Sequence, residues 1–218
     1  MLSTIANKKW ALIATCLFVA TFAQAGQLTS QAQLAGILGA NETMENFEGN
    51  GLLPANVQIL GNFLNSASTF GGYGPGLVQP GVNYSAGGSL YWNYDGYFGL
   101  NTRTLGDASA WRNDATTISY TEDVTAFGFD LSGYSGYDQS GNIAVYNTAG
   151  GLISDTAVNG GFFGWEDLGG IGEVVISATT GYIMIDNHGY GAAPAPEPLS
   201  LVALGLGVAA LARKRRSK

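Results

Sequence analysis

Side chains of a kind that binds sugars lie in an aromatic stretch near the middle of the chain, residues 91–98, which reads Tyr-Trp-Asn-Tyr-Asp-Gly-Tyr-Phe. Aromatic rings stack on the C–H faces of sugars, while neighbouring amides and carboxylates bind the hydroxyls. Trp92, Tyr94 and Tyr97 are therefore candidate sugar-binding residues. Side chains alternate along a strand, so Trp92 and Tyr94 point to the same side. The same stripe is also typical of a hydrophobic core, and both interpretations stay open here.

Residues suited to catalysis are few. The single histidine, His188, lies between Asn187 and Gly189 in a segment that the pattern predicts to be an exposed terminal turn. Neighbouring acids such as Glu166 and Asp167 point to opposite faces of a strand, so they cannot form the paired acid and base of a glycosidase. Nucleophile-elbow, zinc-protease, Walker and dinucleotide-binding motifs do not occur in the context they need. We therefore expect no catalytic residues and a protein that is not an enzyme.

Charge is distributed unevenly along the chain. Between Gly26 and Pro198 the only basic residues are Arg103 and Arg112, whereas all 16 acidic residues of the chain fall in this interval, giving it a formal net charge of −14. Such a surface repels phosphate backbones, so we expect no nucleic-acid partner. It favours divalent cations or neutral polysaccharide, although an acidic surface is equally typical of a solvated secreted protein.

The N-terminal end has the three parts of a secretory signal peptide. Lys8 and Lys9 form a positive region, residues 10–22 are apolar, and Ala23 and Ala25 give the small-x-small pattern of a cleavage site. The mature protein is predicted to begin at Gly26. A lipoprotein signal using Cys16 is the alternative. After cleavage no cysteine remains, so disulfides cannot stabilise the fold.

The C-terminal end has three elements in order, namely a proline-flanked acid, an uncharged run and a basic cluster. They are Pro196-Glu197-Pro198, residues 199–212, and the cluster that contains Arg213, Arg215 and Arg216. The uncharged run would be about 21 Å long as a helix, short of the ~30 Å core that a permanent span must cross. Because basic residues stay on the cytoplasmic side, the segment upstream is predicted to be exported. An ordinary tail anchor with a proline-rich stalk is the alternative.

This order of elements resembles the PEP-CTERM sorting signal of Gram-negative bacteria that make exopolysaccharide. The resemblance implies that the chain is held transiently in the inner membrane. There an exosortase, a membrane-embedded cysteine transpeptidase, recognises and removes the tail. It also implies a secreted or cell-surface protein that acts in the extracellular polysaccharide layer.

The segment between the two ends reads mostly as strands. Ser30 is a suitable N-cap for a short helix that has Leu34, Ile37 and Leu38 on one face and ends near Gly39. After it come short alternating runs separated by turn residues, at 43–47, 82–85, 89–94, 116–120, 126–131, 142–146, 152–158, 162–165, 173–177 and 182–186, with a further short strand at 57–60. Since no helix-length segment separates these strands, parallel crossovers are excluded. The pattern predicts an all-β fold, an antiparallel β-sandwich of the jelly-roll type.

The order of these segments also resembles the jelly-roll domains of PEP-CTERM proteins and, more distantly, carbohydrate-binding modules. The residues that carry the likeness are Asn46-Phe47-Glu48-Gly49, residues 124–130, residues 161–164, and Ile183-Met184-Ile185-Asp186-Asn187. In many such modules a Glu after the first strand and an Asp on the last strand meet at a structural calcium ion. The resemblance therefore implies a calcium site at Glu48 and Asp186, with Asn187 and Asn46 as further oxygen ligands. The alternative places Glu48 and Asp186 in turns, satisfied by backbone amides and water.

Together these observations predict four segments: a signal peptide at 1–25, a β-sandwich at 26–190, an Ala/Pro linker with the Pro-Glu-Pro motif at 191–198, and a transmembrane segment with a basic tail at 199–218. The favoured function is a secreted, non-enzymatic surface or matrix protein, with signal peptidase and exosortase as processing partners and extracellular polysaccharide as the lasting one. A lectin-like carbohydrate-binding module with structural calcium is the second hypothesis. A polysaccharide-active enzyme is the third.

Overall fold

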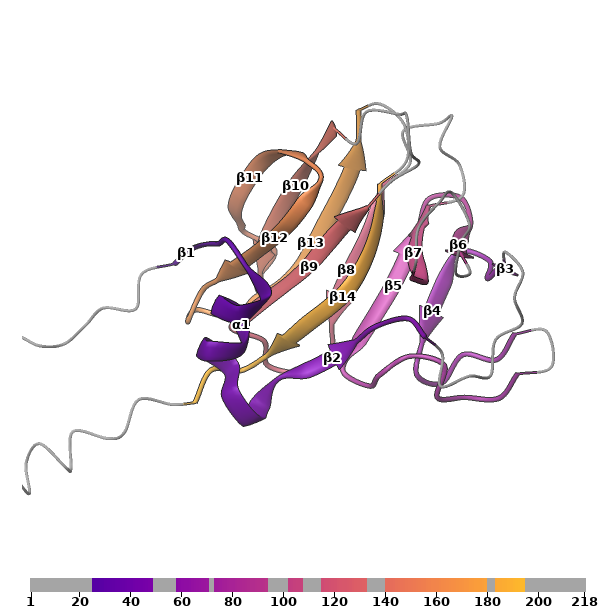
Figure 1. Ribbon diagram of the computed structural model, residues 1–218, viewed down its shortest axis with the longest axis horizontal. Coiled ribbons are helices and arrows are strands. Elements are labelled where there is room, and N and C mark those ends of the chain that lie inside the picture. Colours follow the sequence, from indigo (N-terminus) through magenta and orange to yellow (C-terminus); the bar gives the residue numbers. More distant parts are fainter. Residues whose placement is uncertain are drawn as a thin grey trace, which may run out of the picture.

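The computed structural model describes residues 25–48, 58–70, 73–93, 102–107, 115–132, 140–179 and 183–194. Within these ranges the strands form two sheets, and every pairing between named strands is antiparallel. Figure 1 shows the two layers, with helix α1 (Gln31–Leu38) lying against one of them. The prediction of an all-β antiparallel sandwich with one short N-terminal helix is confirmed.

The two sheets contain different parts of the chain, and only one of them contains the strands nearest its two described ends. The first sheet contains, in spatial order, β1 (Gly26–Leu28), β12 (Gly161–Glu166), β9 (Ala126–Ser132), β14 (Met184–Gly191), β7 (Thr104–Asp107), β6 (Leu90–Asn93) and β3 (Gln58–Ile59), and β2 (Thr43–Glu45) also pairs with β14. The second contains β11 (Leu152–Asn159), β10 (Ser140–Asn147), β13 (Ile171–Ala178), β8 (Thr116–Tyr120), β5 (Val82–Ala86) and β4 (Phe63–Asn65). The first and last described strands therefore both belong to the first sheet.

The core lies between the sheets, where the alternating apolar side chains meet. On the first sheet Phe127 and Phe129 are fully buried, and on the second Ile118, Ile143 and Val174 are fully buried as well. Each of these residues lies in one of the predicted alternating runs, in which side chains two positions apart share a face. The period-2 pattern therefore identified the inner face of both sheets correctly.

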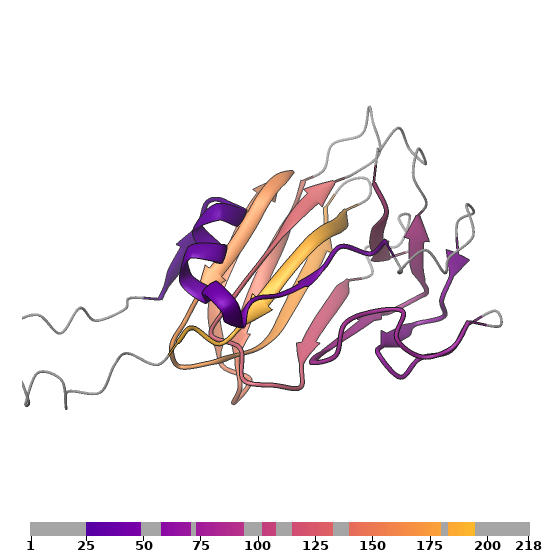
Figure 2. The same cartoon turned by 60° about the horizontal axis from the view of Figure 1, so that its bottom comes forward.

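Helix α1 covers the outer side of the first sheet. Its N-cap is Ser30, whose hydroxyl accepts a hydrogen bond from the Gln33 N–H at 3.2 Å, and Gly39 ends it with a φ of 55°. Leu34 and Leu38 pack into a small second cluster with Leu28 and Ala126. Figure 2 shows the helix against this sheet, away from the second one. The predicted cap, buried face and end of the helix are confirmed.

Strand β14 corrects the prediction for the last part of the domain. The strand was expected to end at Asp186, with His188 in an exposed turn and a linker from Gly191, but it continues to Gly191. Glycine is needed at Gly189 because a Cβ there would lie 2.8 Å from Leu34 Cδ2 of the helix. The glycines that suggest a turn in the sequence instead allow α1 to approach the sheet closely.

Three short strands, β1, β4 and β7, were not predicted, and others differ slightly in their limits. Strand β2 ends at Glu45 rather than at the predicted Phe47, because Phe47 has a φ of 54° and turns the chain away from β14. The turn expected between the runs at 142–146 and 152–158 is confirmed. There the Asn147 N–H bonds the Gly151 carbonyl at 2.8 Å to close the β10–β11 hairpin.

The two ends of the domain lie at the same end of the sandwich (Figure 1). Gly26 is the register partner of Glu166, Glu166 of Ala126, and Ala126 of Gly191. Three strand spacings of ~4.8 Å place Gly26 about 14 Å from Gly191. Beyond the strand, the domain still binds the chain, since Asn41 Nδ2 donates to the Ala192 carbonyl at 3.0 Å and the Ala193 N–H donates to Thr125 Oγ1 at 2.8 Å.

The predicted sorting elements fall mostly outside the described residues. This applies to Ala23, Pro196, Glu197, Pro198, Arg213, Arg215 and Arg216. Ala25 is the first described residue, and it is exposed. In the part of the chain that the structure describes, no helix is long and apolar enough to cross a membrane.

Candidate functional site

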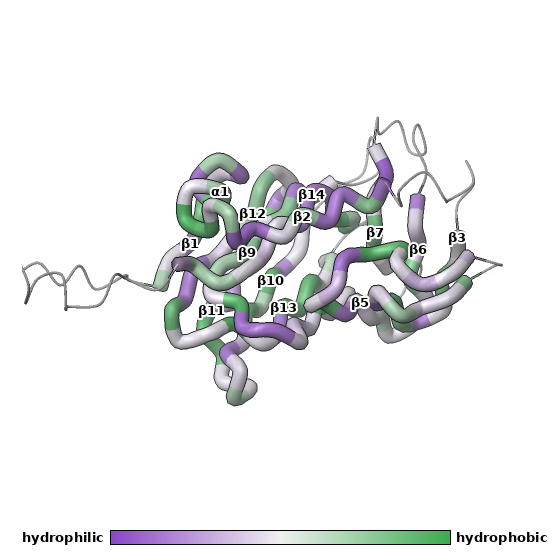
Figure 3. The backbone as a smooth tube through the Cα atoms, turned by 90° about the horizontal axis from the view of Figure 1, so that it is seen from below, coloured by the Kyte–Doolittle hydropathy of each residue, from purple (hydrophilic) through white to green (hydrophobic). Residues whose placement is uncertain are grey.

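The candidate site lies at an interruption in the pairing of β14. Strand β7 pairs with β14 at Met184 and Ile185, and β2 pairs with it from His188 onward. Both strands lie along the same edge of β14, so Asp186 and Asn187 have no strand partner on that side within the described residues. Figure 3 shows hydrophilic stretches gathered where β2 and β14 run together.

A local irregularity in β14 directs two polar side chains to this interruption. The register against β9 shifts between Asp186 and Gly189, and Asn187 adopts a left-handed φ of 49°. Asp186 is also the register partner of Asp130 on β9. Two neighbouring strands therefore bring acidic residues to one point, where β2 and β7 each end or begin.

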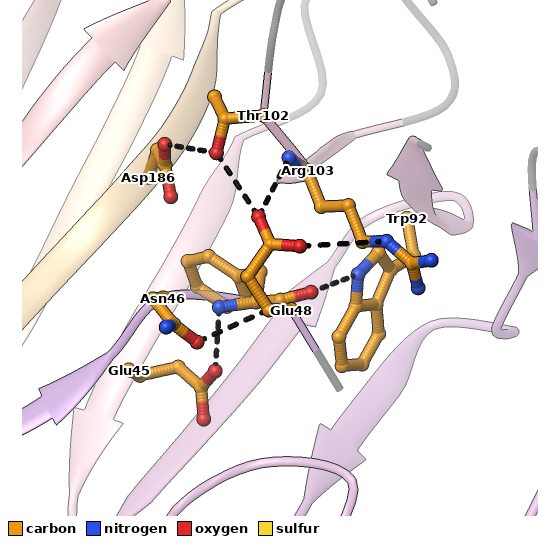
Figure 4. Close-up of polar contacts among 8 residues, drawn as sticks. Glu45, Asn46, Glu48, Trp92, Thr102, Arg103 and Asp186 are labelled. Carbon is orange, nitrogen blue, oxygen red and sulfur yellow. Dashed lines mark hydrogen bonds and ion pairs between the residues drawn. The ribbon is translucent and has the colours of Figure 1, made fainter. Parts of the chain in front are cut away.

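Glu48 and Asp186 converge on the hydroxyl of Thr102. Thr102 Oγ1 lies 2.9 Å from Asp186 Oδ2 and 3.2 Å from Glu48 Oε1 (Figure 4). A threonine hydroxyl has a single proton, so it donates to one of the two carboxylates at a time. The structure therefore brings together the two acids that the resemblance paired, while the binding of an ion there stays a prediction.

Other groups around the two acids supply hydrogen bonds and one positive charge. The Arg103 N–H donates to Glu48 Oε1 at 3.2 Å, and Arg103 Nε lies 3.7 Å from Glu48 Oε2. Asn187 Nδ2 donates to Asp130 Oδ2 at 2.9 Å, so Asn187 offers the acids an amide nitrogen rather than a ligand oxygen. Asn46 Oδ1 accepts from the Glu48 N–H at 3.2 Å and holds the turn in which Glu48 lies.

The carboxyl group of Asp186 has a raised pKa. Asp186 is only 3% exposed, and this burial raises the pKa of its carboxyl to about 6. Hydrogen bonds from Thr102 and Asn187 lower the pKa, while the nearby charges of Asp130 and Glu48 raise it further. The group is therefore a carboxylate that would gain from an added positive charge.

The donor set fits a calcium ion only in part. Carboxylate oxygens are the hard ligands that Ca²⁺ prefers, and two of them share one hydroxyl here. Among the described residues, however, no group of three or more Asp, Glu, His or Cys side chains is arranged to hold a metal ion. Ligands beyond Glu48 and Asp186 would have to come from backbone carbonyls, hydroxyls and water.

Trp92 does not belong to a sugar-binding surface. Its side chain is 1% exposed, and its Nε1–H donates to the Phe47 carbonyl at 2.7 Å (Figure 4). The ring also packs edge-on against Phe47, with centroids 6.0 Å apart. Trp92 points into the core because its strand places it on the inner side, and it holds the turn that presents Glu48. The other two aromatic candidates, Tyr94 and Tyr97, lie outside the described residues.

His188 is fully buried, which the sequence did not indicate. Its Nδ1 lies 2.8 Å from the Tyr84 hydroxyl, and its Nε2 lies 3.0 Å from the Tyr120 hydroxyl. Burial lowers the pKa of the imidazole to about 3, so the ring is neutral at physiological pH. One ring nitrogen then donates and the other accepts, which matches two hydroxyl partners. His188 is thus a core residue with satisfied hydrogen bonds.

Comparisons with known proteins add little to this description. No family model matches the sequence, and no curated protein matches it. Among solved structures the chain is similar to the solution structure of CtCBM11, a carbohydrate-binding module, with 10% sequence identity and a TM-score of 0.28 over 72% of this chain and 98% of that one. A TM-score of 0.28 is too low to support a conclusion about the fold or a ligand of this chain.

Proposed function

We propose that the protein is exported, processed by an exosortase and kept outside the cell as a non-enzymatic surface or matrix protein associated with exopolysaccharide. The observation that carries this proposal is the junction between domain and tail. Hydrogen bonds tie the chain to the sandwich through Ala193, and the Pro196-Glu197-Pro198 motif follows almost at once. A compact acidic domain is thereby joined directly to a tail with the order of a sorting signal. We also propose that the strands of the sandwich have jelly-roll connectivity and that the host is a Gram-negative bacterium.

Sorting can be tested by following the tail in the native host. We expect the secreted protein to begin at Gly26 and to lack residues 199–218. Glu197→Ala, or replacement of Arg213, Arg215 and Arg216, should leave uncleaved protein in the inner membrane, because each removes an element of the signal. Intact mass of the secreted form and immunoblots of the membrane fraction measure both results.

The matched control is Asp123→Ala, which removes an exposed acid from a turn of the domain and should be processed normally. Secretion of full-length protein with its tail attached would contradict the exosortase proposal. Retention of all forms in the membrane, whether or not the signal is intact, would instead favour an ordinary tail anchor.

A second candidate function is a carbohydrate-binding module stabilised by calcium. The convergence of Glu48 and Asp186 on Thr102 supports it, together with the raised pKa of Asp186. Bound calcium would hold the end of β2 against β14 and would offset the repulsion among the acids. The ion would act in the structure alone, with no part in any reaction.

Thermal melting of the purified protein tests this site. At a hundredfold excess over Kd, Ca²⁺ should stabilise the fold by about 2.7 kcal/mol, and Mg²⁺ should do less because it demands octahedral geometry. Glu48→Gln and Asp186→Asn should each abolish the response, whereas Glu166→Gln on β12 should keep it. A melting temperature indifferent to calcium, or a response that both site variants retain, would exclude the ion and leave a hydrogen-bonded acid pair.

A further inference from the structure

A surface hollow on the second sheet is not part of the site described above. Its volume is about 570 Å³, and it lies where β10 turns into β11, lined by Tyr146, Asn147, Thr148, Gly172 and Glu173 among others. This volume falls within the ~300–1,000 Å³ typical of small-molecule sites. The hollow is lined by residues of the second sheet and the adjoining turn, whereas Asp186 lies on the first sheet. It is therefore a separate feature from the site at Glu48 and Asp186.

The strand pattern explains why polar residues and a tyrosine meet there. Ile143 and Val145 point into the core, so Tyr146 points to the outer side of the sheet. Its register partner on β13 is Glu173, which in turn faces Ser119 on β8. The register of β10 against β13 then shifts after Tyr146, and the hairpin turn begins. The irregularity opens the hollow beside a half-buried aromatic ring and a half-buried carboxylate.

The lining side chains have hydrogen-bonding capacity that the described residues do not use. Asn147 Oδ1 accepts from the N–H groups of Ala149 at 3.0 Å and Gly151 at 2.8 Å, which fixes the side chain, but within the described ranges its Nδ2 donates no hydrogen bond. Glu173 Oε2 accepts from Ser119 Oγ at 3.5 Å, whereas Oε1 has no donor among the described groups. The Tyr146 hydroxyl likewise has no partner in the described part of the chain.

We propose that this hollow binds one or two residues of a neutral glycan chain. The Tyr146 ring stacks on the C–H face of a sugar, Glu173 accepts hydrogen bonds from its hydroxyls, and Asn147 donates one. Glu173 and the net charge of −14 between Gly26 and Pro198 disfavour anionic sugars. The inference rests on the proposed association with exopolysaccharide and assigns it a contact site separate from the aromatic stretch at 91–98.

Binding can be measured with sugars from the producer itself. The probe is the exopolysaccharide of the host, partly hydrolysed and separated by anion exchange into neutral and anionic oligosaccharides, titrated calorimetrically into the full-length chain. We expect the neutral fraction to bind and the anionic fraction to bind at least tenfold more weakly. Tyr146→Ala and Thr148→Trp should each weaken binding at least tenfold, the first by removing the stacking ring and the second by filling the hollow from an exposed turn.

Two controls separate binding from folding. Tyr146→Phe keeps the ring and should retain binding within about threefold, and Tyr91→Ala removes a half-exposed tyrosine from β6 on the other sheet and should leave binding unchanged. No binding of the neutral fraction, or binding that survives both Tyr146→Ala and Thr148→Trp, overturns the site. Normal tail removal in the host would then leave the proposed function standing. Glycan binding at the hollow, together with secretion by the host of protein that keeps its tail, would instead support the site and contradict the sorting proposal.

Discussion

Replacing Phe127 with alanine should lower the free energy of unfolding by about 3 to 5 kcal/mol, because it removes a large side chain from a core that can close the cavity only in part. Phe127 is fully buried between the sheets. Its ring centroid lies 5.7 Å from that of Phe129, 6.1 Å from that of Phe163 and 6.1 Å from that of Tyr120. The residue therefore joins three strands of the two sheets. Urea unfolding followed by circular dichroism measures the loss.

Thr117→Ala provides the matched control for Phe127→Ala. Thr117 lies next to the buried Ile118 on β8 but points away from the core and is half-buried. Its replacement should cost less than about 1 kcal/mol, since no cavity forms and only the strand preference changes. Equal losses at the two positions would mean that the face assignment of these strands is wrong.

Acidification should destabilise the protein through His188, with an effect of about 3 kcal/mol between pH 6.5 and pH 4. The folded protein holds this imidazole at a pKa of about 3, below the ordinary value of 6.5. Between these two values the unfolded chain binds a proton that the folded chain excludes, so the free energy of unfolding falls as the pH falls. The groups that face the ring are the hydroxyls of Tyr84 and Tyr120, the ring of Tyr190, and Glu45 across the β2–β14 pair.

Two buried acids act in the opposite direction. The pKa of Asp186 is raised to about 6 and that of Glu45 is also raised, both chiefly by burial. Protonation of Asp186 in the folded state adds stability as the pH falls below about 6, and protonation of Glu45 acts in the same direction, so the two offset part of the loss from His188. The pH dependence of the free energy of unfolding of the wild type therefore combines the contributions of His188, Asp186 and Glu45. A substitution is needed to separate that of His188.

His188→Gln isolates it, because glutamine can both donate and accept hydrogen bonds but does not titrate. We expect the variant to be less stable than the wild type at pH 7, and the difference to shrink by about 3 kcal/mol at pH 4. Denaturant unfolding of both proteins across this range gives the comparison. If the free energies of unfolding of the two proteins changed equally with pH, His188 would take up its proton in the folded protein. That result would contradict a buried imidazole that stays neutral.

The sequence predicted those parts of the fold that depend on residues close together in the chain. Alternating apolar residues around Ile118, Phe127 and Ile143 mark strands with one buried face, and Ser30 and Gly39 mark the ends of a helix. The short strands β1, β4 and β7 have too few residues to show a period, and they exist because longer neighbours offer free edges. Their formation depends on the rest of the sheet.

The site was predictable only where a resemblance supplied the pairing of distant segments. Glu48 and Asp186 could be named because the first and last strands of such domains lie together. Thr102, Arg103 and Asp130 were missed, since their proximity depends on the registers of β7 and β9 against β14. The prediction of an exposed turn at His188 was wrong for a related reason. The glycines near it in the sequence are typical of a turn, and their role in the contact with α1 depends on a segment far away in the chain.

The position of β14 has a mechanical consequence. The chain leaves the domain at the end of this strand, which is hydrogen-bonded to β9 along one edge and to β7 and β2 along the other. A pull on the tail beyond Pro194 therefore acts along the strand and loads its hydrogen bonds together, in shear, rather than opening them one at a time. In the proposed function, tension from a membrane-bound tail, or from a matrix attached in its place, would be carried by this strand, which is hydrogen-bonded on both sides.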